Sequence, residues 1–165
     1  MIDVGKIYYI NVQDKNKKII FRVYFVKKLC YNSTRGLIRK QGRGIMARVL
    51  VCDDAAFMRM TLIKILKEGG HTAVAEAGDG EAAVRKYKEY HPDVVLMDIT
   101  MPEVDGLEAT RQITEYDPNA LVIMVSAMGQ QGKVFEAIAS GAKDFIVKPF
   151  DPNKILECID KYINV

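Results

Sequence analysis

Residues 48–54 read RVLVCDD, four consecutive apolar residues followed by two adjacent aspartates. An apolar run on consecutive positions is typical of a strand buried on both faces, as in a parallel sheet. The pattern therefore predicts a first strand at Val49–Cys52. Four more short apolar runs follow and are interpreted as further strands: Thr72–Ala75, Val94–Met97, Leu121–Val125 and Phe145–Val147.

Longer amphipathic stretches separate these runs and are predicted to be helices. The first covers Ala56–Glu68, and the fourth covers roughly residues 131–140 and ends before Gly141. The second, third and fifth are expected to begin at the N-cap residues Asp79, Asp105 and Asp151. Strict alternation of strands and helices predicts an α/β fold, a doubly wound five-stranded parallel sheet with five helices on its two faces.

Polar side chains stand at the carboxyl ends of four predicted strands, where ligands bind in doubly wound sheets. Asp53 and Asp54 follow the first strand, and Asp98 follows the third. Ser126 follows the fourth and Lys148 the fifth. If these four strands are neighbours, three carboxylates, a hydroxyl and an ammonium converge on one rim. The alternative is that some aspartates are helix N-caps, with Asp54 capping the first helix, but this does not account for Asp98.

Three close carboxylates repel one another, and a divalent cation relieves that repulsion. Mg²⁺ prefers carboxylate, carbonyl and water oxygens, whereas zinc prefers Cys and His, which no predicted strand end carries. The two histidines, His71 and His91, fall at element boundaries and are expected to be solvated. A carboxylate beside Mg²⁺ and a lysine can attack phosphorus, so the residue types indicate Asp98 as the nucleophile with Mg²⁺ as cofactor.

Charge divides the chain into two parts. Residues 1–45 hold 11 Lys and Arg against 2 acids, a net charge of +9, whereas residues 46–165 hold 13 against 19, a net charge of −6. The compact part is therefore acidic, which argues against nucleic-acid binding by that part. No stretch is apolar for the roughly 20 residues that a membrane helix needs. The cysteines Cys30, Cys52 and Cys158 lack metal-ligand spacing, which favours reduced thiols in a cytoplasmic protein.

Five separated motifs, in order, resemble those of bacterial response-regulator receiver domains. They are Arg48–Asp54, Met97–Pro102, the pair Asp105-Gly106, the pair Ser126-Ala127 and Lys148–Phe150. The resemblance covers residues 46–165. The longer strings DAAFMRM, DITMP, SAMGQQ and GAKDFIVKPF are similar to the chemotaxis (CheY) branch in Gram-positive bacteria and Thermotoga-like lineages.

The resemblance implies a flavodoxin-like or CheY-like sheet in the order 2-1-3-4-5. It implies that Asp98 is the phosphorylated residue. It also implies that Mg²⁺ is held by Asp53 through water, by Asp54, by Asp98 and by the carbonyl of Thr100.

Three further residues take roles only through the resemblance. Ser126 would close onto the phosphoryl group, Lys148 would bind it, and Phe145 would be the aromatic switch residue, where many relatives have tyrosine. Lys148-Pro149 is expected to be cis, as in relatives. The implied partners are a CheA-type histidine kinase, the flagellar motor switch and a CheC/CheX-type phosphatase, and the implied state is a monomer without multiple-turnover activity.

Competing functions differ in testable features. A lone receiver could instead be a sporulation-type phosphorelay intermediate, whereas a transcriptional regulator would need a DNA-binding domain after the fifth helix, and this chain ends at Val165. An aspartate-nucleophile phosphohydrolase usually carries a second aspartate two residues after the first, where this chain has Thr100. No glycine-rich phosphate loop follows the first strand either.

Residues 1–45 are interpreted as a basic extension outside the receiver domain at residues 46–165. The segment shows no sustained hydrophobic period and is expected to be disordered apart from a marginal hairpin. A second hypothesis is that a misassigned start codon joins it to the chain, since residues 39–44, RKQGRG, could translate a purine-rich ribosome-binding site. Mass spectrometry of the first peptide of the native protein distinguishes the two hypotheses.

Overall fold

The computed structural model describes residues 13–14, 17–18, 45–127 and 133–163. The chain falls into two compact units, Met1–Arg35 and Gly36–Val165. The first contains β1 (Gln13–Asp14) and β2 (Lys17–Lys18), which pair antiparallel. The other predictions for residues 1–44 lie outside the described residues, so the proposed domain boundary at residue 46 stays a prediction.

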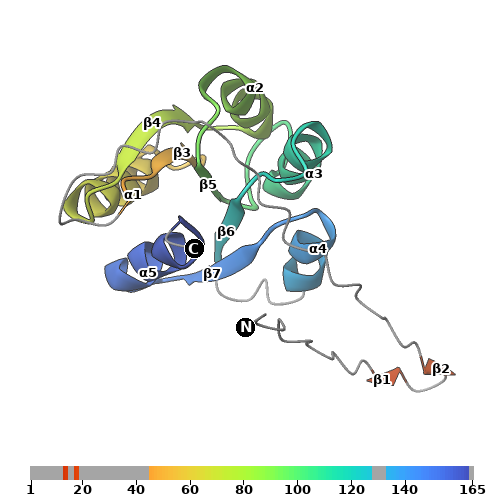
Figure 1. Ribbon diagram of the computed structural model, residues 1–165. Helices are drawn as coiled ribbons and strands as arrows, with labels where there is room; N and C mark the ends of the chain where they lie inside the picture. Colours follow the sequence, from red (N-terminus) through yellow and green to blue (C-terminus); the bar gives the residue numbers. More distant parts are fainter. Residues whose placement is uncertain (1–12, 15–16, 19–44, 128–132, 164–165) are drawn as a thin grey trace, which may run out of the picture. The chain divides into compact units, whose positions relative to one another are not determined.

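The second unit alternates five strands with five helices (Figure 1). Its strands are β3 (Arg48–Cys52), β4 (Thr72–Ala77), β5 (Val94–Met97), β6 (Val122–Ala127) and β7 (Asp144–Lys148). Its helices are α1 (Ala56–Glu68), α2 (Gly80–Tyr90), α3 (Gly106–Tyr116), α4 (Lys133–Ala139) and α5 (Pro152–Ile163).

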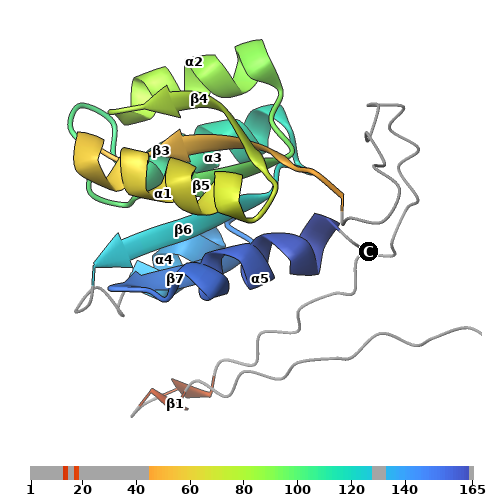
Figure 2. The ribbon, with the colours of Figure 1, turned by 90° about the vertical axis from the view of Figure 1, so that its left-hand side faces the viewer.

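All five strands pair parallel in the order β4-β3-β5-β6-β7. Numbered within this unit, the order is 2-1-3-4-5, so the predicted doubly wound fold is confirmed. Helices α1 and α5 cover one face of the sheet, and α2, α3 and α4 cover the other (Figures 1 and 2). The core has two matching layers, one containing Leu62, Leu66 and Ile159 and the other Tyr87, Leu107 and Ile113. Among the described residues, no helix is long and apolar enough to cross a membrane.

The predicted helix ends are largely confirmed. Asp79 accepts a hydrogen bond from the Ala82 amide, and Asp105 accepts one from the Glu108 amide, as N-caps do. Gly141 has a φ of +98°, the left-handed conformation that suits a residue just after a helix.

Two predicted strands end two residues too early. β4 continues to Ala77 because Glu76 and Ala77 pair with Val51 and Cys52 of β3. β6 continues through Ser126 and Ala127, which pair with Val147 and Lys148 of β7. Both extensions depend on backbone pairing, which an apolar run alone does not reveal.

The expectation that His71 is solvated is wrong. The residue is buried between α1 and β4 and is only 6% exposed. Its Nδ1 accepts a hydrogen bond from the Ala47 amide at 3.3 Å, so the proton of the neutral ring lies on Nε2. Nε2 lies 3.7 Å from Oδ1 of Asp160 on α5 and makes no hydrogen bond. Burial lowers the pKa of His71, and Asp160 opposes this only in part.

Acidification is therefore expected to destabilise this unit through His71. The native ring resists protonation, whereas the unfolded ring takes up a proton near its ordinary pKa of about 6.5. The neutral His71 ring therefore contributes to the stability of the fold above a pH of about 6.5. This contribution is lost as the pH falls through the pKa of the native ring. Urea unfolding at about pH 7.5 and pH 5.5 measures the loss. The variant His71→Asn keeps an acceptor for the Ala47 amide and should lose less stability, whereas His91→Asn should match the wild type. An equal loss in wild type and His71→Asn would contradict this account.

Candidate metal centre at the carboxyl edge of the sheet

Two neighbouring strands deliver aspartates to the same edge of the sheet. Asp53 follows Cys52 of β3, Asp98 follows Met97 of β5, and Cys52 and Met97 are register partners. The strand arrows of β3, β4 and β6 point toward this edge (Figure 2). Backbone hydrogen bonds hold both aspartates in line, from the Asp53 amide to the Ala77 carbonyl and from the Asp98 amide to the Cys52 carbonyl. The fold thus fixes the acidic residues before any ligand binds.

Three carboxylates gather at this edge. One carboxylate oxygen from each of Asp53, Asp54 and Asp98 lies within 4.8 Å of the others. Asp53 and Asp98 are buried, with 1% and 6% of their surface exposed, whereas Asp54 is exposed. An all-oxygen group that is open on one side suits Mg²⁺, which keeps part of its water shell. The residues present therefore fit the cofactor predicted from the sequence.

Lys148 supplies a positive charge to the same group. Its Nζ lies 2.6 Å from Oδ2 of Asp53 and 3.2 Å from Oδ1 of Asp98. β5 and β6 separate β7 from β3, so the long lysine side chain spans the edge of the sheet. The predicted convergence of Asp53, Asp54, Asp98 and Lys148 is confirmed.

Burial raises the pKa of Asp98 above its ordinary value. Lys148 opposes this effect, and the neighbouring Asp53 adds to it. An ionised Asp98 is therefore costly even beside Lys148, and a bound divalent cation would favour the ionised, nucleophilic form.

The remaining predicted site residues lie around this group. Thr100 is exposed, two residues beyond Asp98, and Ser126 is buried in β6. Phe145 is half-buried in β7, packs against the core layer that faces α2, α3 and α4, and is the register partner of Met124. The Lys148-Pro149 bond is cis, as expected. The roles of Thr100, Ser126 and Phe145 remain predictions.

Arg59 on α1 is a contact that the sequence analysis missed. Its Nη1 donates to the carbonyl oxygens of Asp53 and Asp54, and its Nε donates to Oε2 of Glu76 on β4. In sequence, Arg59 is one of several basic residues on an amphipathic helix. Only the placement of α1 against the edge reveals the contact.

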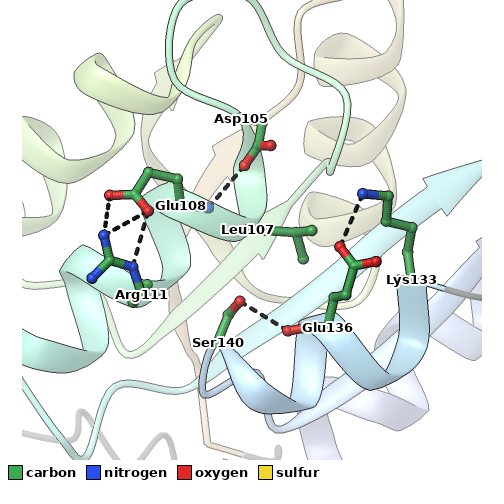
Figure 3. A pocket seen from close by; sticks show the side chains of 7 residues that line it. All are labelled: Asp105, Leu107, Glu108, Arg111, Lys133, Glu136 and Ser140. Atoms are coloured by element: carbon green, nitrogen blue, oxygen red, sulfur yellow. Dashed lines mark hydrogen bonds and ion pairs between the residues drawn. The ribbon is translucent and has the colours of Figure 1, made fainter.

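A hollow lies between α3 and α4 (Figure 3). It encloses about 260 Å³ and is lined by Asp105, Leu107, Glu108, Arg111, Lys133, Glu136 and Ser140. Four of its charged side chains form ion pairs: Arg111 binds Glu108 at 2.6 Å, and Lys133 binds Glu136 at 2.9 Å. Figure 3 shows these pairs on the walls of the hollow. Asp105 caps α3 through the Glu108 amide, so the described charges of this hollow all have a partner within the chain, and the acidic edge is the candidate site.

The fold and the acidic edge define a receiver domain, and comparison with known proteins agrees. Residues 49–160 match the family described as response regulator receiver domain, and the chain belongs to this family.

The chain is also highly similar to chemotaxis proteins named CheY. The chain is 56% identical to CheY of Thermotoga maritima over 114 residues, which are 69% of this chain and 95% of the relative. It is 56% identical to CheY of Bacillus subtilis over 117 residues, 71% of this chain and 98% of the relative. Among solved structures, CheY in a CheX–CheY–BeF₃–Mg²⁺ complex from Borrelia burgdorferi superposes with a TM-score of 0.67 at 41% identity. That superposition covers 72% of this chain and 89% of the other.

Proposed function

We propose that this protein is a chemotaxis response regulator that accepts a phosphoryl group on Asp98. One observation carries the proposal: buried Asp98 lies beside two further carboxylates and within 3.2 Å of Lys148. Asp53, Asp54, Asp98 and the carbonyl of Thr100 would hold Mg²⁺. When bound, Mg²⁺ offsets the negative charge that gathers on the phosphoryl oxygens.

The chain's own residues explain the transfer. A carboxylate oxygen of Asp98 forms a bond to phosphorus as the bond from phosphorus to the donor's imidazole nitrogen breaks, and the imidazole keeps the electron pair. Lys148, which pairs with Asp53 and Asp98 at rest, then neutralises a phosphoryl oxygen. The product is an acyl phosphate, which water hydrolyses. The protein therefore removes only its own phosphoryl group and is not a multiple-turnover enzyme.

The phosphoryl group adds about −1.5 to −2 charges at neutral pH and creates a two-state switch. Ser126 moves toward the phosphoryl oxygens, and Phe145 turns into the space that Ser126 leaves. Ser126 lies on β6 and Phe145 on the neighbouring edge strand β7. The face formed by α4, β7 and α5 therefore changes shape. A partner that reads this face binds one state more tightly than the other.

The proposed partners follow from the family resemblance. A CheA-type histidine kinase donates the phosphoryl group, and the flagellar motor switch protein reads the altered face. A CheX-type phosphatase is a third partner, supported by the CheX–CheY complex of the Borrelia relative. The protein acts as a cytoplasmic monomer, and its receiver domain does not bind nucleic acid.

Binding to a motor-switch peptide tests this function. Acetyl phosphate with Mg²⁺ is expected to raise the affinity for a fluorescently labelled motor-switch peptide by about tenfold, within the usual range of coupling between two sites. Fluorescence anisotropy measures the affinity. An unchanged affinity, together with onward transfer of the phosphoryl group to a second histidine protein, would instead support the phosphorelay function.

Mg²⁺ is expected to stabilise the wild-type protein against unfolding. Binding to the folded state alone contributes about 2.7 kcal/mol at 100 times the dissociation constant. Asp54→Ala removes an exposed ligand and should reduce this gain without disturbing the core, because Asp54 lies outside the buried layers. Urea unfolding with and without MgCl₂ measures the effect. A Mg²⁺-dependent gain of equal size in Asp54→Ala would contradict the proposed ligand set.

A further inference from the structure

Arg59 holds the backbone that carries the acidic pair. Its Nη1 lies 2.9 Å from the Asp53 carbonyl oxygen and 3.2 Å from the Asp54 carbonyl oxygen. Nη1 carries two hydrogens, so one nitrogen can serve both carbonyls. The side chain is only 20% exposed, so these bonds are partly shielded from water.

Glu76 anchors the guanidinium from the neighbouring strand. Nε of Arg59 lies 3.1 Å from Oε2 of Glu76 on β4. β4 also holds the loop from its other side, because the Asp53 amide donates to the Ala77 carbonyl. The loop is therefore fixed between α1 and β4 through both its amide and its carbonyl groups.

The orientation of the Asp53 carboxylate depends on this frame. Oδ1 of Asp53 accepts a hydrogen bond from the Ala55 amide at 2.9 Å, and Oδ2 contacts Lys148. A rotation of the peptide after Asp53 or Asp54 would move both the Ala55 amide and the two carboxylates. Arg59 binds the carbonyls of these two peptides and so opposes such a rotation.

An electrostatic role and a positioning role predict opposite effects of removing Arg59 on the affinity for Mg²⁺. Its positive charge repels a dication at the acidic edge, so a purely electrostatic role means that removing Arg59 tightens Mg²⁺ binding. Positioning of the loop means that removing Arg59 weakens it. The hydrogen bonds to both carbonyls favour positioning, since the guanidinium is directed to the backbone of the metal-binding loop.

We propose that Arg59 is a positioning residue for Mg²⁺ binding, which holds the Asp53 and Asp54 peptides in the orientation that the metal needs. This inference rests on the proposed function, because it assumes that the acidic edge binds Mg²⁺. Residues that orient metal ligands without touching the metal typically contribute tenfold to 100-fold in affinity.

Isothermal titration with MgCl₂ tests the proposal. Arg59→Met keeps most of the apolar stem and removes the donors, and it is expected to weaken Mg²⁺ binding by about tenfold. Arg59→Lys keeps the charge without the planar fork and should show a smaller loss of about threefold. Lys64→Met is the matched control: it removes one positive charge from an exposed position on the same helix and should bind Mg²⁺ as the wild type does or slightly more tightly.

A second readout needs no metal. Without Mg²⁺, the Ala55 amide should exchange its hydrogen faster in Arg59→Met than in the wild type, because the loop is less restrained. Circular dichroism establishes that each variant is folded at the temperature used. If Arg59→Met does not fold, Arg59→Lys decides the question by the same two measurements.

The outcomes separate this inference from the proposed function. Mg²⁺ binding as tight in a folded Arg59 variant as in the wild type, or tighter, would overturn the positioning role and leave the proposed function intact. Failure of the wild type itself to bind Mg²⁺ would overturn the proposed function. Weaker binding in Arg59→Met with an unchanged Lys64→Met supports the positioning role.

Discussion

Replacing Asp98 with asparagine is expected to abolish phosphorylation by acetyl phosphate in the presence of Mg²⁺. The amide has nearly the shape of the carboxylate but is a poor nucleophile, so no acyl phosphate can form at this position. Asp53 and Asp54 remain, and their carboxylates would bind the cation without accepting the phosphoryl group. A phosphate-affinity gel separates the phosphorylated from the unphosphorylated protein and measures the loss.

The Asp98→Asn protein is expected to remain folded, which makes the loss interpretable. Burial raises the pKa of Asp98, so the ionised side chain costs stability at neutral pH, and the neutral amide removes that cost. The metal-free variant should therefore melt no lower than the wild type. Glu115→Gln on the exposed surface of α3 is a control that removes one carboxylate away from the edge. If the gel shows Asp98→Asn phosphorylated to the same extent as this control, another residue is the acceptor.

Replacing Gly106 with alanine is expected to disrupt the same edge through the backbone. A Cβ at this position would lie 1.8 Å from the carbonyl oxygen of Asp98 and 2.8 Å from its carbonyl carbon. Both are backbone atoms, so no side-chain rotation relieves the clash. The Gly106 amide also donates to the Ile99 carbonyl, which ties the start of α3 to the loop after β5. Overpacking typically costs about 1–3 kcal/mol, and a clash with backbone atoms lies at the upper end of that range.

Urea unfolding measures this loss, and Gly78→Ala provides the control. A Cβ at Gly78 would have its nearest neighbour, Nη1 of Arg59, at 3.6 Å, an ordinary contact. Gly106→Ala should therefore be far less stable than Gly78→Ala, and its Mg²⁺ affinity should fall because Asp98 is displaced. Equal free energies of unfolding for the two variants would contradict the close approach of α3 to the Asp98 backbone.

Much of the fold could be predicted from the sequence because the three central strands, β3, β5 and β6, are buried on both faces. Runs such as Val94–Met97 have no polar interruption, and Asp79 and Asp105 mark helix starts through local capping that short-range patterns reveal. The order of the strands in the sheet cannot be read from short-range sequence patterns, because pairing between distant segments determines it. The family resemblance, not the patterns, implied the observed order.

The candidate site was predictable where residues follow a strand directly. Asp53, Asp54 and Asp98 occupy such positions, and parallel pairing brings them together. Arg59 and His71 were missed or misjudged because their environments depend on how α1 and α5 pack. Arg59 reaches the edge from the first turn of α1, and α5 places Asp160 opposite His71. No spacing along the chain encodes these contacts.

Chemical trapping of the phosphorylated residue tests the central claim most directly. Borohydride reduces an aspartyl phosphate to homoserine, and mass spectrometry of the peptides then locates the modified position. After treatment with acetyl phosphate and Mg²⁺, the account predicts homoserine at residue 98 and none when Mg²⁺ is chelated. Homoserine at residue 53 or 54, or at any aspartate outside the edge, would contradict it.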